Sequence, residues 1–220
     1  RTWRMAPVEY AELKMQAELR TGRIVGGLSL LLIIGGILTN FVLTASLFGE
    51  PGFLVAAAGN APKIALSALV GVAMGLVSIG VASLLYPVFR QRSQTLGLFY
   101  FALVVAGFAL TVVANISVMS LLSLSQAYAE AGGAQPELYD GLKIVVKSAR
   151  NWTHYISMIV SGCTLFVFYF AMFRFRLIPR LLSVFGLLAV CSQLYAVTTP
   201  LFGIDVDFRF IAPLGICEII

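Results

Sequence analysis

The chain reads Lys63-Ile-Ala-Leu-Ser-Ala-Leu-Val-Gly-Val-Ala-Met-Gly-Leu-Val-Ser-Ile-Gly-Val-Ala-Ser-Leu-Leu-Tyr-Pro-Val-Phe-Arg90, and the 26 residues between those two charged ends carry no charge. A helix needs about 20 mostly apolar residues to cross the roughly 30 Å hydrocarbon core of a bilayer. The run is long enough to do so, and its charged ends mark where the chain would leave the lipid. This stretch therefore predicts a transmembrane helix.

Four other segments share this pattern, with 26, 37, 23 and 24 uncharged residues. They lie between Arg23 and Glu50, Arg92 and Glu130, Arg150 and Arg174, and Arg180 and Asp205. The 37-residue run is too long for one span, because at about 1.5 Å per residue it measures roughly 55 Å. Its later part is rich in serine (Ser117, Ser120, Ser123 and Ser125), so we expect the helix to leave the hydrocarbon there and continue into water.

A further apolar run follows Arg209 and occupies residues 210–220. Eleven residues cannot cross a bilayer, so the run is either a short interfacial end or a sixth span that is cut short. We favour the cut-short span, because no helix stop signal precedes Ile220. The predicted fold is an all-α polytopic transmembrane bundle over residues 23–220. Its six spans are expected at about 24–48, 64–88, 95–120, 151–173, 181–203 and, incomplete, 210–220.

The composition supports a membrane protein. The chain of 220 residues is 60% hydrophobic and 11% charged, with a mean hydropathy of +0.95. Soluble domains carry about 25% charged residues, so this chain could not cover itself with polar groups in water. The net charge of +5 comes from short basic segments between apolar runs, without interleaved aromatic residues. We therefore expect anionic lipids as partners and no nucleic acid.

The distribution of basic residues predicts the orientation. Ten lysines and arginines lie before the first span and in the loops at 90–92 and 174–180. The opposite side carries five, together with six carboxylates. Because basic residues accumulate on the cytoplasmic side, we expect the N-terminus in the cytoplasm.

Two segments have the pattern of surface helices. Residues 1–22 are predicted as a cytoplasmic interfacial helix, in which Pro7 suits the first turn. One face of residues 7–20 carries Val8, Ala11, Met15 and Leu19. In the second segment, 136–149, one face carries Leu138, Leu142, Val145 and Ala149, and we expect this helix to continue into the fourth span. For both, a solvated connecting helix is the alternative to binding at the membrane surface.

Strongly polar side chains inside predicted spans are the candidate functional residues, because such groups are costly in lipid. They are Glu218, Asn115, Asn40, Gln193 and His154. The three amides can hydrogen-bond neighbouring helices. Glu218 can do the same or form a substrate or ion site. His154 lies beside Trp152 and Tyr155 in a predicted aromatic belt, where it serves as an interfacial hydrogen-bonding group, a proton relay or an axial ligand.

The sequence offers no catalytic motif, so we assign no catalytic residue. It has one histidine, and Cys163, Cys191 and Cys217 all lie in apolar runs without the spacing of a metal or redox pair. We found no phosphate-binding loop, nucleophile elbow or zinc-protease motif. We therefore predict no metal site and no cofactor other than bound lipids.

Three short motifs carry a family resemblance: Thr21-Gly-Arg-Ile-Val-Gly-Gly, Val81-Ala-Ser-Leu-Leu-Tyr-Pro-Val-Phe-Arg90 and Arg174-Phe-Arg-Leu-Ile-Pro-Arg180. They resemble bacterial multi-pass proteins of the domain-of-unknown-function 4386 family over about residues 20–220. The resemblance implies a six-helix bundle in the bacterial inner membrane whose last helix carries an early glutamate, as Glu218 does here. It brings no activity and no catalytic residues. The stretch Asn151-Trp-Thr-His154 departs from the more apolar pattern expected of the family.

Three functional hypotheses follow. The first is a non-catalytic subunit or partner within a larger membrane assembly, made with other subunits or with a second copy of the chain. The second is a small transporter, or a protein that binds lipids or small molecules, using Glu218 and Asn115. The third is a membrane enzyme using His154, although the sequence favours a role without catalysis.

Overall fold

The computed structural model describes residues 7–47, 52–132 and 134–203. Every regular element in these ranges is a helix, which confirms the all-α class. The long helices are α1 (Pro7–Ile37), α3 (Ala61–Arg90), α4 (Gln94–Glu130), α5 (Pro136–Phe175) and α6 (Arg180–Thr198). The short ones are the π-helix η1 (Leu38–Leu43), the 3-10 turns η2 (Ala45–Leu47) and η3 (Thr199–Phe202), and α2 (Phe53–Gly59).

Five helical segments are long and apolar enough to cross a membrane. They are Met15–Leu43, Ala61–Arg90, Gln94–Glu130, Glu137–Phe175 and Arg180–Phe202. Each contains most or all of one of the five full-length spans predicted from the charge-free runs. The predicted sixth span, 210–220, lies outside the described residues.

Three helices run without a break beyond the predicted spans. α4 continues through its serine-rich part to Glu130, and α5 begins at Pro136 and continues into the fourth span, as expected from the sequence. α1 is one helix from Pro7 to Ile37, so residues 7–20 and the first span share a single axis. The interfacial position of residues 1–22 stays a prediction.

Local signals explain where the helices begin and end. The Ser93 side chain accepts a hydrogen bond from the Leu96 amide at 3.3 Å, which caps the first turn of α4. Pro136 occupies the first turn of α5, where its missing N–H removes no helical bond. Arg176 then takes a left-handed conformation (φ 55°), and the Leu177 amide donates to the Met172 carbonyl at 3.1 Å, which closes α5.

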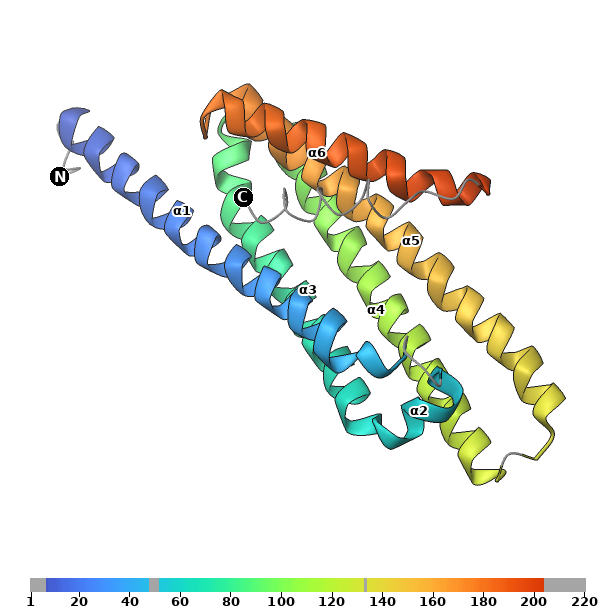
Figure 1. Ribbon diagram of the computed structural model, residues 1–220. Coiled ribbons are helices and arrows are strands. Elements are labelled where there is room, and N and C mark those ends of the chain that lie inside the picture. Colours follow the sequence, from blue (N-terminus) through green and yellow to red (C-terminus); the bar gives the residue numbers. More distant parts are fainter. Residues whose placement is uncertain (1–6, 48–51, 133, 204–220) are drawn as a thin grey trace.

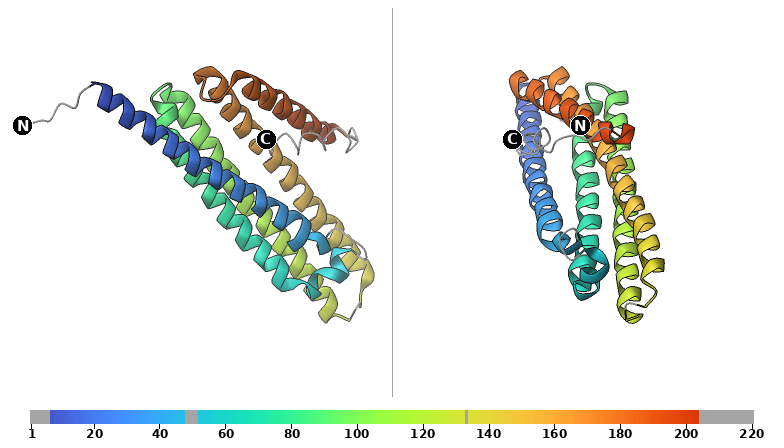
Figure 2. Two further views of the ribbon diagram at one scale, coloured as in Figure 1. Left: turned by 60° about the vertical axis from the view of Figure 1, so that its left-hand side comes forward. Right: turned by 45° about the vertical axis from the view of Figure 1, so that its right-hand side comes forward.

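The long helices form an open row (Figure 1). α1 packs against α3, α3 against α4, α4 against α5, and α5 against α6. α1 and α6 therefore stand at the two edges of the row, and Figure 2 shows α6 inclined to α5. The turns that join α3 to α4 and α5 to α6 lie at the same end of the molecule.

Two separate hydrophobic cores hold the row together. The first lies near the α3–α4 and α5–α6 turns and centres on Phe89, which is fully buried. Its ring lies 5.4 Å from the ring of Tyr100 and 6.4 Å from that of Phe175, measured between centroids. This core also contains Val81, Ala82, Leu85, Val104, Ala171 and Met172.

The second core lies at the opposite end, where α2 packs against α4. It contains Leu47, Phe53, Leu54, Ala57, Ile64, Leu121 and Leu122. Two hydrogen bonds attach α2, since the fully buried Ser125 hydroxyl donates to the Leu54 carbonyl and accepts from the Ala58 amide, both at 2.9 Å. Ser125 thereby satisfies two backbone groups at the start and end of a seven-residue helix.

Close packing of α3 on α4 predicts a difference between two glycines of one helix. A Cβ added at Gly75 would meet the edge of the Phe108 ring, whereas a Cβ at Gly80 would meet nothing within 4 Å. We expect Gly75→Ala to lower the free energy of unfolding by about 1–3 kcal/mol, the usual range for overpacking. Gly80→Ala is the matched control, because it brings the same gain in helix propensity, up to about 1 kcal/mol, without the clash. Unfolding in mixed micelles measures both, and equal stabilities would contradict the packing.

Candidate functional site

The register of α4 against α5 places two of the candidate residues at one level. The rings of Tyr100 and Phe168 lie 6.0 Å apart, and those of Tyr128 and Tyr139 lie 5.2 Å apart. Because the two helices are antiparallel, Asn115 lies opposite residues 152–153 of α5. Along the helix axes, Asn115 therefore lies within about one helical turn of His154.

Asn115 points toward a glycine of α3. A Cβ added at Gly71 would lie 2.8 Å from Asn115 Nδ2 and 3.0 Å from Oδ1, so the amide occupies the space that a larger residue would fill. Nδ2 is buried and has no hydrogen-bond partner among the described residues. A buried unpaired amide donor costs roughly 1–3 kcal/mol, which makes this group a binding candidate.

α1 reaches the same level through η1. Gly35 faces Met74 of α3, whose Sδ would lie 2.5 Å from a Cβ added at the glycine, so Asn40 lies level with residue 69 of α3. Asn40 is exposed, and its Nδ2 donates to the Gly36 carbonyl at 3.0 Å. The neighbouring Thr39 Oγ1 is buried and has no partner in the described part of the chain. Short π-helical stretches such as η1 are rare and occur frequently at functional sites.

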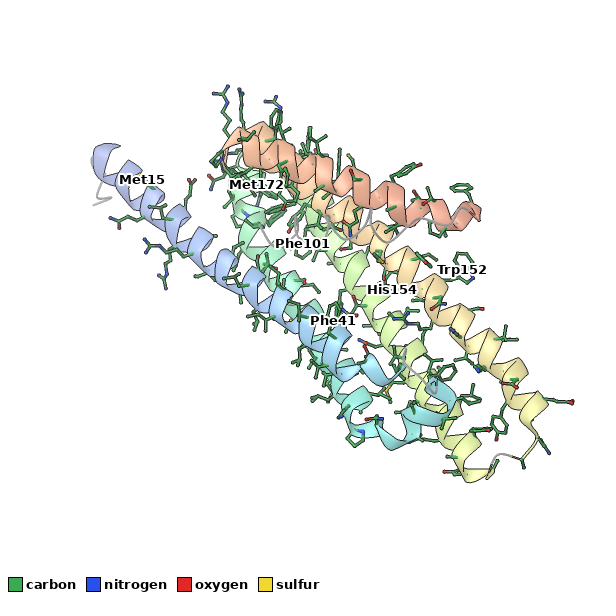
Figure 3. All side chains as sticks on the ribbon, viewed as in Figure 1. Met15, Phe41, Phe101, Trp152, His154 and Met172 are labelled. Carbon is green, nitrogen blue, oxygen red and sulfur yellow. The ribbon has the colours of Figure 1, made fainter. Side chains whose placement is uncertain are left out.

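His154 is half-buried on the part of α5 that runs alongside α4 (Figure 3). Its carbonyl accepts a hydrogen bond from Ser157 Oγ at 2.7 Å, and its ring centroid lies 6.5 Å from that of Tyr155. We call Thr39, Asn115 and His154 the polar layer, because they lie at one level between the two hydrophobic cores. Each of these three side chains can hydrogen-bond water or a small polar group at this level.

Gln193 lies at a different level. A Cβ added at Gly162 would lie 2.6 Å from Leu194 Cδ2, so Gln193 is level with residues 162–163 of α5, more than two turns from His154. Its Oε1 is buried without a hydrogen-bond partner in the described ranges. Glu218 lies outside those ranges. The structure therefore brings Asn115 and His154 to one level and places Gln193 elsewhere.

Sequence reasoning missed Thr39 and Ser183, whose hydroxyl oxygens are also buried and unpaired within the described chain. Threonine and serine in a helix commonly donate to the carbonyl four residues earlier, as Thr111 does to Gly107 at 3.0 Å. No sequence signal distinguishes a hydroxyl that makes this bond from one that does not. Within residues 7–47, 52–132 and 134–203, no group of three or more His, Cys, Asp and Glu side chains could hold a metal ion.

Comparison with known protein families gives one match. The profile of the family described as "Domain of unknown function (DUF4386)" matches residues 24–220. The chain belongs to this family. No curated protein and no solved structure shows a significant match.

Membership of DUF4386 confirms the resemblance noted from the three sequence motifs. The matched range begins one residue after Arg23 and includes all of the polar layer, Gln193 and Glu218. The family description gives no activity, so the function of this DUF4386 protein has to be inferred from its own residues.

Two substitutions separate an unpaired buried group from a paired one in this DUF4386 chain. We expect Asn115→Leu to leave the free energy of unfolding unchanged or to raise it, because the amide donor has no partner to lose. Ser125→Ala is the contrasting variant and should lower it by about 1–3 kcal/mol, because it removes two buried hydrogen bonds between α4 and α2. Unfolding in mixed micelles measures both. A marked loss of stability in Asn115→Leu would show that the amide is bound to water or to a ligand in the membrane.

Proposed function

We propose that this protein is a six-span protein of the bacterial inner membrane that serves as a non-catalytic subunit or partner within a larger membrane assembly. One observation carries the proposal. The apolar face predicted for residues 136–149 exists in α5, and it is exposed rather than packed on the bundle. The exposed fractions are 54% for Leu138, 42% for Leu142 and 66% for Val145.

The same stretch of α5 packs on the second core through its other side. Tyr139 and Val146 contact that core, and the Tyr139 hydroxyl donates to the Ala127 carbonyl at 3.1 Å. The orientation of this half of α5 is thus fixed by contacts with α4. The apolar face of Leu138, Leu142 and Val145 consequently points away from every described helix.

Lipid does not cover the apolar face of Leu138, Leu142 and Val145. Residues 137–150 include Glu137, Asp140, Lys143, Lys147 and Arg150, whereas residues 151–173 carry no charge apart from the ionisable His154. A charge at the centre of a bilayer costs at least about 2.5–3.5 kcal/mol, so the second half of α5 is the part that lies in the bilayer. Because α5 is one unbroken helix, its first half extends from the lipid into water. An apolar face in water marks a protein contact.

Aromatic and basic residues support this placement of the bilayer. Trp152 is exposed, and tryptophan side chains settle at membrane interfaces. Arg174 lies 22 residues from Trp152 on α5, or roughly 33 Å along the helix axis, which is close to one hydrocarbon thickness. With the basic loops in the cytoplasm, the N-terminus is cytoplasmic and the apolar face of α5 is on the outer side.

A second candidate function rests on the polar layer. The unpaired Asn115 Nδ2 favours a transporter or a protein that binds a lipid or small molecule there, with Glu218 as the predicted acidic partner. An enzyme that uses His154 stays the third hypothesis. A subunit role needs neither a bound ligand nor a reaction, and it accounts for the exposed face directly.

The proposal predicts that the apolar face of α5 holds the assembly together. We expect Leu142→Asn/Val145→Asn to reduce the native mass of the gently solubilised protein to that of a monomer. Ser120→Asn/Ser123→Asn is the matched control, because it adds the same amides to exposed positions on the corresponding half of α4. Light scattering of protein extracted from its native membrane measures the mass. A parent protein that is already a lone monomer would remove the subunit hypothesis.

A further inference from the structure

An apolar groove lies between α4, α5 and α6, near the end where α5 turns into α6. It has a volume of about 380 Å³, within the range of roughly 300–1,000 Å³ that is usual for ligand pockets. Phe99 and Leu103 line it from α4, Phe166 and Val167 from α5, and Cys191 and Leu194 from α6. None of these side chains carries a charge, so the groove suits a hydrocarbon chain.

Two arginines lie on the groove side of the helices that form it. Arg174 follows Val167 by seven residues on α5, and Cys191 follows Arg180 by eleven on α6. Separations of seven and eleven residues return to nearly the same face of a helix with 3.6 residues per turn. Arg174 therefore lies about 10 Å beyond the groove on α5, and Arg180 about 16 Å before Cys191 on α6.

The surroundings of these arginines are strongly positive. The first core brings the α5–α6 turn next to the α3–α4 turn, since Phe175 packs on Phe89. The two turns carry five exposed arginines: Arg90, Arg92, Arg174, Arg176 and Arg180. Residues 86–99 and 170–185 contain no aspartate or glutamate. Figure 3 shows nitrogen-tipped side chains extending outward from this end.

We propose that the groove binds one acyl chain of an anionic phospholipid whose phosphate is held by Arg174 and Arg180. The spacing suits this ligand, because one leaflet's share of the hydrocarbon is about 15 Å. The guanidinium groups bind phosphate oxygens through charge-assisted hydrogen bonds, and a zwitterionic lipid offers them less net charge. The site is at the opposite end of the molecule from the exposed face of α5 and does not depend on the proposed assembly.

Photocrosslinking tests the proposal. The full chain is placed in phosphatidylcholine nanodiscs with a trace of phosphatidylglycerol that carries a diazirine near the end of one acyl chain. Labelled peptides should contain residues 99–103, 163–167 or 191–194. A phosphatidylcholine probe should label these peptides about tenfold less, because each arginine near the surface favours an anionic lipid. Labels elsewhere, or equal labelling by both probes, would overturn the proposal.

Two pairs of variants locate the contacts. Arg174→Gln/Arg180→Gln should lower labelling by phosphatidylglycerol roughly tenfold, whereas Arg20→Gln/Arg23→Gln, with the same loss of charge on α1, should leave it unchanged. Cys191→Phe should block the groove, whereas Ser192→Phe, at the next exposed position of α6, should not. Equal losses within either pair would overturn the site. Should the glutamine pair fail to fold, Arg174→Lys/Arg180→Lys keeps the charge and must retain most of the labelling.

Discussion

The length of α4 and α5 relative to the bilayer is the constraint on which the rest of the structure depends. These helices have 37 and 40 residues and measure roughly 55–60 Å, about twice the 30 Å of the hydrocarbon. One half of each is apolar enough for lipid, and the other half carries serines or charges. Because neither helix breaks, the proposed bilayer covers only one half of each, and a second core holds the other halves together. α2 and the start of α3 supply it.

The polar layer lies at the border between these two environments. In the first core, aromatic rings pack around Phe89, and in the second, aliphatic and aromatic side chains pack beside the hydrogen bonds of Ser125. Between them, α3 presents Gly71 and Gly75, which let Asn115 and Phe108 of α4 approach its backbone. On the bilayer placement proposed above, water begins to reach the helices at this depth, so an amide or hydroxyl without a protein partner is less costly than in mid-membrane. Two of the four buried polar atoms that lack a partner among the described residues, Thr39 Oγ1 and Asn115 Nδ2, lie at this level.

Much of the fold could be predicted from the sequence, because charge is expensive in lipid and uncharged length is easily counted. The five described spans followed from that rule, and the continuity of α5 from Pro136 followed from the apolar face of residues 136–149. The register could not be predicted. The hydrogen bond from Ser125 to Leu54 joins residues 71 positions apart, and the sequence around either residue does not predict it. The positions of Asn115 and Gln193 along the bundle depend on contacts of the same long-range kind. Both could be identified from the sequence as candidate residues, but not that they lie far apart.

Exposure of leucine and valine side chains has different energetic consequences in the two halves of this molecule. Leu76 of α3 and Leu188 of α6 are 57% and 63% exposed, much like Val145. Within the bilayer such exposure costs nothing, because lipid tails are as apolar as leucine, and the open row of helices can remain open. Beyond the bilayer the same exposure faces water and is unfavourable by roughly 25 cal/mol for each Å². On the proposed placement of the bilayer, burial against a protein partner would therefore stabilise the first half of α5 and would bring no such gain at the lipid-facing edges of the row.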